Sequence, residues 1–163
     1  MSIGNKDISY VIGKEKFNYR VCGIMLHEGK ILAMHDERSP YYYLPGGRVS
    51  MGEPAEEAVL REIREELEIE AEISRPLWLS QSFFTEDTDG LKYHELCLYF
   101  LIDISKTDLL FKGEHFTLFE NRSRHEFEWL PIERLSEEYF YPLFLKTEIF
   151  HLPDQLQLRT DFE

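Results

Sequence analysis

The feature that most constrains this chain is a glutamate-rich helix, which the pattern predicts over residues 54–67, directly after a glycine-rich turn. Pro54 suits the first helical position and places Glu53 at or near the N-cap. Projected at about 100° per residue, the helix shows an apolar stripe along one side. The stripe consists of Ala55, Ala58, Val59, Ile63 and Leu67. We therefore expect this side of the helix to be buried.

Three acids conflict with a purely structural role for the helix. Glu62 and Glu66 project into the apolar arc and Glu65 borders it, so the three carboxylates share roughly a third of the circumference. Like charges four residues apart repel by about 0.2–0.5 kcal/mol even when exposed, and buried unpaired carboxylates cost far more. Divalent cations would remove the conflict, because clustered carboxylate oxygens are the ligands that Mg²⁺ or Mn²⁺ selects. The ordinary alternative is a solvated face, against which the angular position of Glu62 and Glu66 argues.

The turn before the helix contains Pro45, Gly46 and Gly47, and Gly52 loosens the approach to the helix. Such a turn exposes backbone N–H groups, and phosphate oxygens can complete the coordination shell of a cation held by carboxylates. Turn and helix together indicate a device that holds metal ions against a polyphosphate.

These residues resemble the Nudix box, Gly-x5-Glu-x7-Arg-Glu-U-x-Glu-Glu-x-Gly-U, in which U is a bulky aliphatic residue. The positions that match at the right spacing are Gly47, Glu53, Arg61, Glu62, Ile63, Glu65, Glu66 and Ile69. Glu68 stands where the family has glycine. A left-handed glutamate would cost about 1 kcal/mol, so we expect the helix to end differently, for example by running on to Glu70.

The resemblance implies a Nudix-type pyrophosphohydrolase, which cleaves the diphosphate linkage in a nucleoside diphosphate linked to X. It also implies the family's α/β/α sandwich with a mixed β-sheet, and the order of strands, helix, strands, helix predicted here agrees with that α/β fold. We expect a single domain over residues 1–163, with 1–16 as an N-terminal arm and 151–163 as a frayed tail.

Runs of β-forming residues flank the helix. They predict a hairpin with its turn at residues 28–30, a long strand over 71–84, a central strand over 93–104 and a strand over 125–130. Residues 105–124 read as an irregular loop or lid, because they exceed the usual length of a connection. Residues 139–150 read as a last helix, interrupted by Pro142.

The net charge of −13 argues against non-specific binding to a nucleic-acid polymer or an anionic membrane. An acidic protein can still bind a polyphosphate when cations bridge the two. No apolar run reaches the length of a membrane span, and residues 1–17 lack an apolar signal core, so we expect a cytoplasmic protein. Cys22 and Cys97 lie in strand-like runs and are expected to be buried thiols.

The resemblance assigns roles to the residues of the box. We expect Glu62, Glu65 and Glu66 to be metal ligands, with Glu53 able to reach the same ions directly or through water. Two or more Mg²⁺ (or Mn²⁺) ions would polarise phosphorus and lower the pKa of an attacking water. Arg61 would orient an acid, either Glu53 or Glu65.

The remaining roles rest on position in the chain. The backbone of Gly46 and Gly47 would ligate a metal or approach a phosphate. Glu62 is the first choice for the general base, with Glu126 and Glu120 as outside candidates. For Tyr43 and its neighbours there are two alternatives, either stacking on a base or packing of alternate tyrosines into the core with one exposed. Basic residues that could touch outer phosphates or ribose, among which the sequence does not choose, are Arg20, Arg38, Arg48, Lys92, Arg122 and Arg124.

The substrate is expected to be a nucleotide derivative such as ADP-ribose, a nucleotide sugar or a (d)NTP. The alternative function is a catalytically silent nucleotide-binding or sensor domain of the same fold. Retention of every box carboxylate favours the enzyme. The family resemblance also allows a homodimer.

Overall fold

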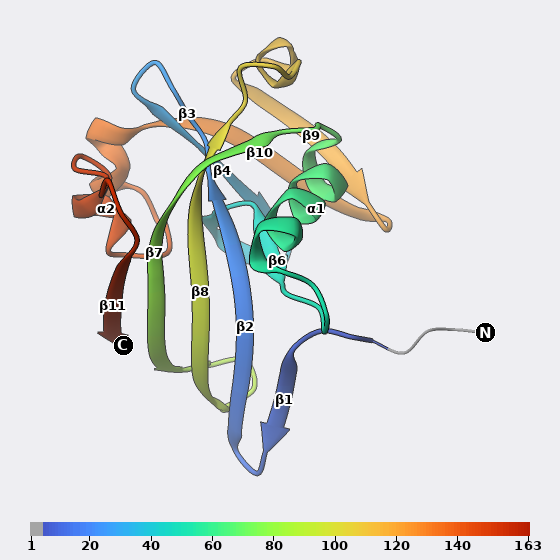
Figure 1. Cartoon of the computed structure of the whole chain (residues 1–163), viewed down its shortest axis with the longest axis vertical. Helices are drawn as coiled ribbons and strands as arrows, with labels where there is room; N and C mark the ends of the chain where they lie inside the picture. Colours follow the sequence, from blue (N-terminus) through green and yellow to red (C-terminus); the bar gives the residue numbers. More distant parts are fainter. Residues whose placement is uncertain (1–4) are drawn as a thin grey trace.

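A computed structural model describes residues 5–163 as two β-sheets and one long helix, α1 (Ala55–Leu67) (Figure 1). The larger sheet is mixed, because β2 runs parallel to β8 and β11 runs parallel to β7, while its other pairs are antiparallel. Its strands, in order across the sheet, are β1 (Ser9–Ile12), β2 (Glu15–Ile24), β8 (Lys92–Asp103), β7 (Glu72–Thr85) and β11 (Gln157–Phe162), and β6 (Gly46–Arg48) also pairs with β2. The predicted central strand is β8, so that prediction is confirmed.

The second sheet is antiparallel. Its strands, in order, are β3 (Leu26–His27), β4 (Lys30–Asp36), β10 (Ser123–Pro131) and β9 (His115–Glu120), and β5 (Ser39–Tyr43) also pairs with β4. The predicted turn joins β3 to β4. Glu28 and Gly29 there have φ angles of 47° and 73°, as the tight turn of a two-residue hairpin requires.

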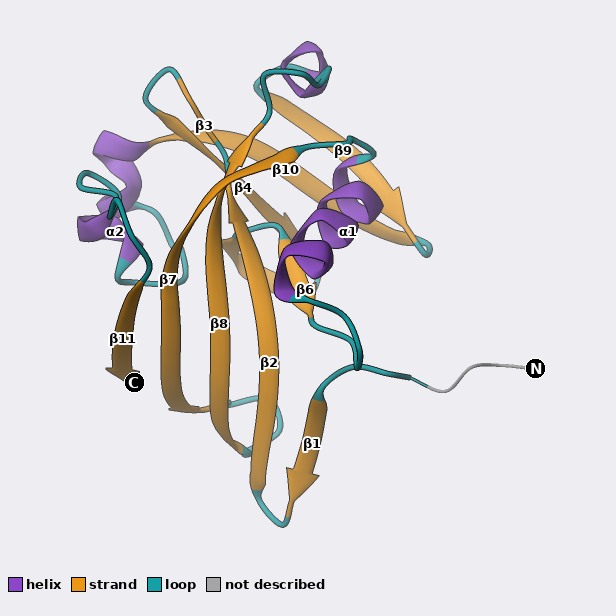
Figure 2. Ribbon diagram, in the orientation of Figure 1, coloured by secondary structure: helices purple, strands orange, loops and turns teal. Residues whose placement is uncertain are grey.

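Helix α1 contacts strands of both sheets (Figure 2). The predicted stripe is buried and joins a core with residues such as Val21, Phe100 and Phe127. Gly23 of β2 makes this packing possible, because a Cβ there would lie 3.0 Å from Cδ1 of Ile63. Each fully buried large apolar side chain contributes about 1.5–3 kcal/mol, so this stripe anchors the helix and everything it carries.

The other face of the larger sheet is covered by the segment after β10. This segment contains the 3₁₀ turn η2 (Ile132–Glu137) and the short helix α2 (Leu145–Glu148). Leu135, Phe140 and Leu145 pack with Ile24 and Trp78 in a second core. The mixed α/β fold with a mixed sheet is therefore confirmed, with helical cover on both faces of the sheet.

The predicted loop over residues 105–124 was wrong in part. It contains the 3₁₀ turn η1 (Leu109–Lys112) and strand β9, which pairs with β10. The Phe116 ring of β9 stacks on Phe127 of β10 at a centroid distance of 5.1 Å. Strand β10 provides the partner for β9. The mixture of polar and aromatic residues in this segment gave no strand pattern from which the pairing could be predicted.

Two predictions near the C-terminus were also wrong. The last helix begins only at Leu145, because Pro142 biases the residue before it away from helical angles and Phe140 forms a β-bridge with Tyr42. The tail is not frayed, since β11 pairs in parallel with β7 and Gln81 Nε2 donates a hydrogen bond of 3.1 Å to Thr160 Oγ1.

The expected N-terminal arm is in part strand β1, which pairs with β2, while residues 1–4 of it lie outside the described part of the chain. Within residues 5–163, no helix is both long enough and apolar enough to cross a bilayer.

Candidate active site

Helix α1 begins one residue later than predicted. Pro54 is the N-cap, with φ −63° and ψ 148°, and Glu53 lies in the turn before it. The Glu53 carboxylate accepts a hydrogen bond of 3.1 Å from the backbone N–H of Ser50. Glu53 is thus held beside the first turn of the helix, next to the glycine-rich approach.

The helix ends at Leu67, so the expected extension to Glu70 was wrong. Glu68 adopts the left-handed conformation, with φ 59° and ψ 37°, and its N–H donates to the carbonyl of Arg64 at 2.9 Å. The next residue explains why this strain is tolerated. Ile69 is only 4 % exposed, and burying its side chain contributes about 1.5–3 kcal/mol, which outweighs the cost of about 1 kcal/mol for the left-handed residue.

Gly47 and Glu62 fit together so closely that any larger residue in the loop would displace the Glu62 carboxyl group. A Cβ at Gly47 would lie between 2.4 and 2.6 Å from the carboxyl atoms of Glu62. The loop strand β6 therefore forms a cradle for this carboxylate. The site places a helix acid directly against the backbone of the turn, as an ion shared by the two would require.

Glu66 is the most deeply buried acid of the site. It is 6 % exposed, and its Oε1 accepts a hydrogen bond of 3.2 Å from the N–H of Gly46. Burial, together with the negative charges of Glu62 and Glu120, raises the pKa of Glu66 well above its usual value. Burial is also the largest cause of the raised pKa of Glu62, which Arg61 only partly opposes.

Arg61 links the acids at both ends of the site. Its Nε and Nη2 donate to the two carboxylate oxygens of Glu53, at 2.7 and 3.0 Å, and its Nη1 donates to Glu62 at 2.9 Å. Nη1 also lies 3.3 Å from Glu65, whose side chain is 45 % exposed. Arg61 thus contacts both acids named as its partners, and its hydrogen bonds are the main reason why the pKa of Glu53 is lowered.

The two outside candidates for the general base lie in different surroundings. Glu120, at the end of β9, is close enough to α1 for its charge to raise the pKa values of Glu62 and Glu66. Glu126 instead accepts hydrogen bonds from Thr117 at 2.9 Å and pairs with Arg124 at 2.7 Å. The hydrogen bond from Thr117 is the main cause of its lowered pKa. The fold therefore groups Glu120, and not Glu126, with the helix acids.

His125 was not among the residues predicted for the site, because a lone histidine carries no spacing signal. Its Nδ1 is buried without a hydrogen-bond partner in residues 5–163 and lies 4.0 Å from Oε2 of Glu120. His125 is thus a polar side chain close to the Glu120 carboxylate.

The adjacent tyrosines point to opposite sides of β5. Tyr43 donates a hydrogen bond of 2.7 Å to Asp36, while Tyr42 packs against the second core. Tyr41 contacts Tyr141 and Tyr139 at centroid distances of 5.1 and 5.7 Å. The group formed by Tyr41, Tyr43, Tyr139 and Tyr141 is called the tyrosine cluster below.

The donor set fits a hard divalent cation. Glu62 and Glu66 supply carboxylate oxygens, and the loop at Gly46 and Gly47 supplies backbone groups. In the described part of the chain, no three acidic, histidine or cysteine side chains already converge on one point. The raised pKa values show that these acids lack sufficient positive charge in their surroundings, and a cation would supply it.

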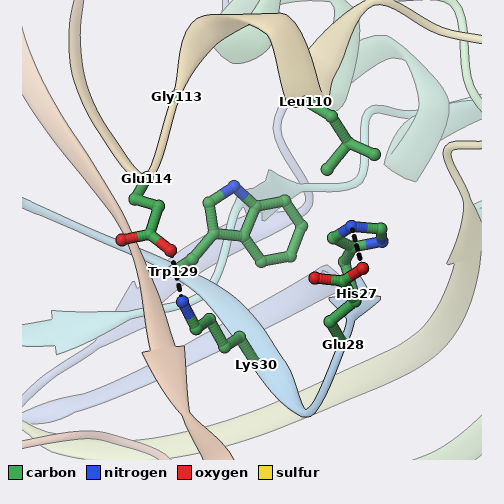
Figure 3. Close-up of a pocket in the computed structure, with 7 residues that line it drawn as sticks. All are labelled: His27, Glu28, Lys30, Leu110, Gly113, Glu114 and Trp129. Carbon is green, nitrogen blue, oxygen red and sulfur yellow. Dashed lines mark hydrogen bonds and ion pairs between the residues drawn. The ribbon is translucent and has the colours of Figure 1, made fainter.

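A hollow of about 210 Å³ lies elsewhere, between the β3–β4 hairpin and η1 (Figure 3). Trp129 forms its floor, and Lys30 and Glu114 form an ion pair across one side. Its wall contains none of the predicted site residues, so it is separate from the carboxylate site.

Comparisons with known proteins complete the description. A family model described as the NUDIX domain matches residues 16–147. The ADP-ribose pyrophosphatase of Methanocaldococcus jannaschii is 34 % identical over 87 residues, which cover 52 % of this chain and 49 % of that protein. The chain thus spans about half the length of this curated relative.

Two solved structures illustrate the likeness in three dimensions. A MutT protein from Bacillus halodurans has a TM-score of 0.60 at 14 % identity, over 89 % of each chain. An ADP-ribose pyrophosphatase from Streptococcus suis has a TM-score of 0.55 at 15 % identity, over 88 % of this chain and 98 % of that chain. At these identities the comparison establishes the fold.

Proposed function

This chain belongs to the Nudix family, and from that premise we propose that it is a metal-dependent pyrophosphohydrolase. Its substrate would be a nucleoside diphosphate linked to X, cleaved at the diphosphate by attack of water on phosphorus. The observation that supports this most directly is the pair of buried helix acids, Glu62 and Glu66, held against the backbone of Gly46 and Gly47. A protein under selection for stability alone would not retain two such carboxylates with raised pKa values.

In this proposal Glu62, Glu65 and Glu66 hold Mg²⁺ or Mn²⁺ together with the backbone of Gly46. When bound, the ions supply neutralising charge for the diphosphate and lower the pKa of the attacking water. Arg61 is a positioning residue, because its contacts are with Glu53, Glu62 and Glu65 and with the carbonyl of Arg48. Glu53 would reach the ions from the start of the helix.

We propose that the proton of the attacking water is taken by Glu62 or by Glu120. For Glu62 the support is its raised pKa, which suits a base near neutral pH better than a lowered one, and for Glu120 the support is its position near the helix acids. Glu126 is the weaker candidate, since Thr117 and Arg124 already occupy its oxygens.

The substrate panel should begin with ADP-ribose, because two of the relatives are named for cleaving it. Nucleotide sugars and (d)NTPs complete it. A single domain over residues 1–163, a cytoplasmic location and a homodimer belong to the same proposal, and light scattering of the purified protein would check the dimer.

The test is release of phosphate from this panel in Mg²⁺, Mn²⁺ or EDTA, with a phosphatase coupled to detect the products. We expect cleavage that depends on the metal and is lost in Glu66→Gln. Glu57→Gln is the matched control, because Glu57 lies on the exposed side of the same helix. Metal-independent activity, or equal activity of Glu66→Gln and Glu57→Gln, would refute the proposal. Ligand-induced thermal stabilisation without any cleavage would instead indicate a silent sensor domain.

A further inference from the structure

A group of polar side chains lies on the face of the larger sheet opposite α1, where an apolar face would be expected. In the strand register, Asn18 of β2 pairs with Glu95 of β8, which pairs with Ser82 of β7. One step along, Arg20 pairs with Cys97, which pairs with Ser80. The group formed by Asn18, Arg20, Ser80, Ser82 and Glu95 is called the polar patch below.

Arg20 is the one member of the polar patch with a buried side-chain atom that lacks a hydrogen-bond partner among residues 5–163. Its Nε is buried without a hydrogen-bond partner, and within residues 5–163 its guanidinium forms no hydrogen bond to a side chain and no ion pair within 4.0 Å. By contrast, Asn18 bonds Ser9 at 2.6 Å and Glu95 at 3.3 Å, and Ser80 bonds Ser82 at 3.2 Å. A buried N–H without an acceptor costs free energy, so a ligand that accepts a hydrogen bond from Nε of Arg20 would remove that cost.

The negative charge of Glu95 favours the cationic form of Arg20. Burial by itself would lower the pKa of Arg20, but the nearby carboxylate of Glu95 acts in the opposite direction and the net effect is a raised pKa. Arg20, Glu95 and Ser82 each keep part of their surface exposed, while Asn18 and Ser80 are buried behind them. The accessible part of the patch therefore presents a cationic donor next to an anionic acceptor.

The patch lies beside the part of β2 that pairs with the glycine-rich loop. Arg20 pairs with Arg48 of β6, and two residues further along β2, Cys22 pairs with Gly46, whose N–H binds Glu66. Two residues of a strand span about 7 Å. The patch is therefore about 7 Å along β2 from the position that pairs with Gly46.

The tyrosine cluster borders the same region. Tyr43 is close enough to both Glu66 and Arg20 for their charges to act on its hydroxyl. Glu163 similarly lies within reach of both Glu95 and Tyr141. Aromatic side chains beside a polar patch are the usual combination for a heterocyclic base, which stacks on its face and forms hydrogen bonds along its edge.

Building on the proposed function, we propose that the polar patch recognises the base of the substrate and selects guanine through Arg20 and Glu95. Guanine offers two neighbouring acceptors, O6 and N7, which match the donors of an arginine fork. Its N1–H and N2 amino groups are donors, which match a carboxylate. Adenine offers no acceptor at position 6, so it cannot satisfy Arg20 in the same way.

The test is isothermal titration of the full-length protein with GMP, IMP and AMP in Mg²⁺. We expect the wild type to bind GMP at least about 10-fold tighter than AMP, within the discrimination that a bidentate contact supplies. Arg20→Gln should reduce this preference to within about 2-fold while AMP affinity changes little. Glu95→Gln should reduce the preference for GMP over IMP, because IMP lacks the N2 amino group.

Two further variants separate recognition from folding. Arg20→Lys keeps the charge but lacks the planar fork, so it should fold like the wild type and still lose the preference. Arg134→Gln removes an exposed arginine of η2 and should leave every affinity unchanged. Equal or undetectable affinities of the wild type for GMP and AMP would overturn the inference, as would an equal loss of both in Arg20→Lys.

Failure of this inference is distinct from failure of the proposed function, because binding of a monophosphate needs no hydrolysis. Metal-dependent cleavage without a preference among bases would overturn the assignment of the patch alone. A preference for GMP that Arg20→Gln removes, in a protein that cleaves no diphosphate, would support the patch and overturn the hydrolase.

Discussion

Two clusters of ionisable side chains in this protein are built in opposite ways. Around Glu126, on β10, an acid receives a hydrogen bond from Thr117 and a charge partner in Arg124, and its pKa is lowered. Around Glu62 and Glu66, on α1, acids are gathered with too little positive charge, and their pKa values are raised. The first arrangement stabilises the native state as it stands. The second destabilises it, and under the proposed function a bound cation would supply the missing positive charge.

The largest effect should come from Glu66→Gln. Loss of a direct metal ligand should lower turnover by more than about 100-fold, since even removal of a group behind a ligand costs about 10–100-fold. Without metal, the same change should raise the free energy of unfolding by about 0.5 kcal/mol or more, because one buried like charge is removed. Steady-state kinetics and urea unfolding in EDTA measure the two effects.

The contrast between the two clusters would be refuted if Glu66→Gln lowered the free energy of unfolding of the metal-free protein. That outcome would mean that the acid is already well paired in the native state. Glu57→Gln, on the exposed side of α1, should change neither quantity and provides the baseline.

Gly47→Ala should have the next largest effect. Its Cβ would lie within 2.4 to 2.6 Å of the Glu62 carboxyl group, so that side chain would have to leave its cradle. We expect turnover to fall by about 100-fold, as when a supporting group around a metal ligand is displaced. Calorimetric titration with Mn²⁺ should show weaker binding at the same time. Unchanged Mn²⁺ affinity would show that Glu62 does not need this position.

Glu68→Gly tests the structural end of the same helix. Glycine adopts the left-handed conformation without the penalty of about 1 kcal/mol, so the variant should be more stable by roughly that amount. The gain should be the same with and without Mg²⁺, since the Glu68 side chain is exposed. A gain that appears only with metal would make Glu68 part of the site. Thermal unfolding in Mg²⁺ and in EDTA distinguishes the two outcomes.

Glu126→Gln should have the smallest effect, and its sign should be opposite to that of Glu66→Gln. Because the folded-state pKa of Glu126 is lowered, its contribution to stability is present above the unfolded-state pKa and is lost as pH falls through the folded-state value. At pH 7 the variant should be less stable by under about 1 kcal/mol, as expected of a partly exposed pair. At about pH 3 the difference should shrink. A stabilised variant at pH 7 would remove the contrast between the two clusters.

The sequence by itself determined the elements whose signals are local. The apolar stripe of α1 repeats with the helical period, the hairpin at Glu28 and Gly29 follows a short turn, and the acids of the box have fixed spacing. These features depend on residues a few positions apart, so they can be predicted before any partner is known.

Tertiary structure alone decided the rest. Strand β11 forms because it pairs with the edge of β7, which lies more than 70 residues earlier in the chain. The polar sequence of β11 gives no local signal of this pairing. Glu68 takes a left-handed conformation because the core accepts Ile69. The sheet pairing brings Glu120 near α1, gives Glu126 its hydrogen bond from Thr117, and leaves Nε of Arg20 buried without a hydrogen-bond partner among residues 5–163. Burial and pairing of a charge depend on which strands become neighbours, and that information resides in long-range contacts rather than in local spacing.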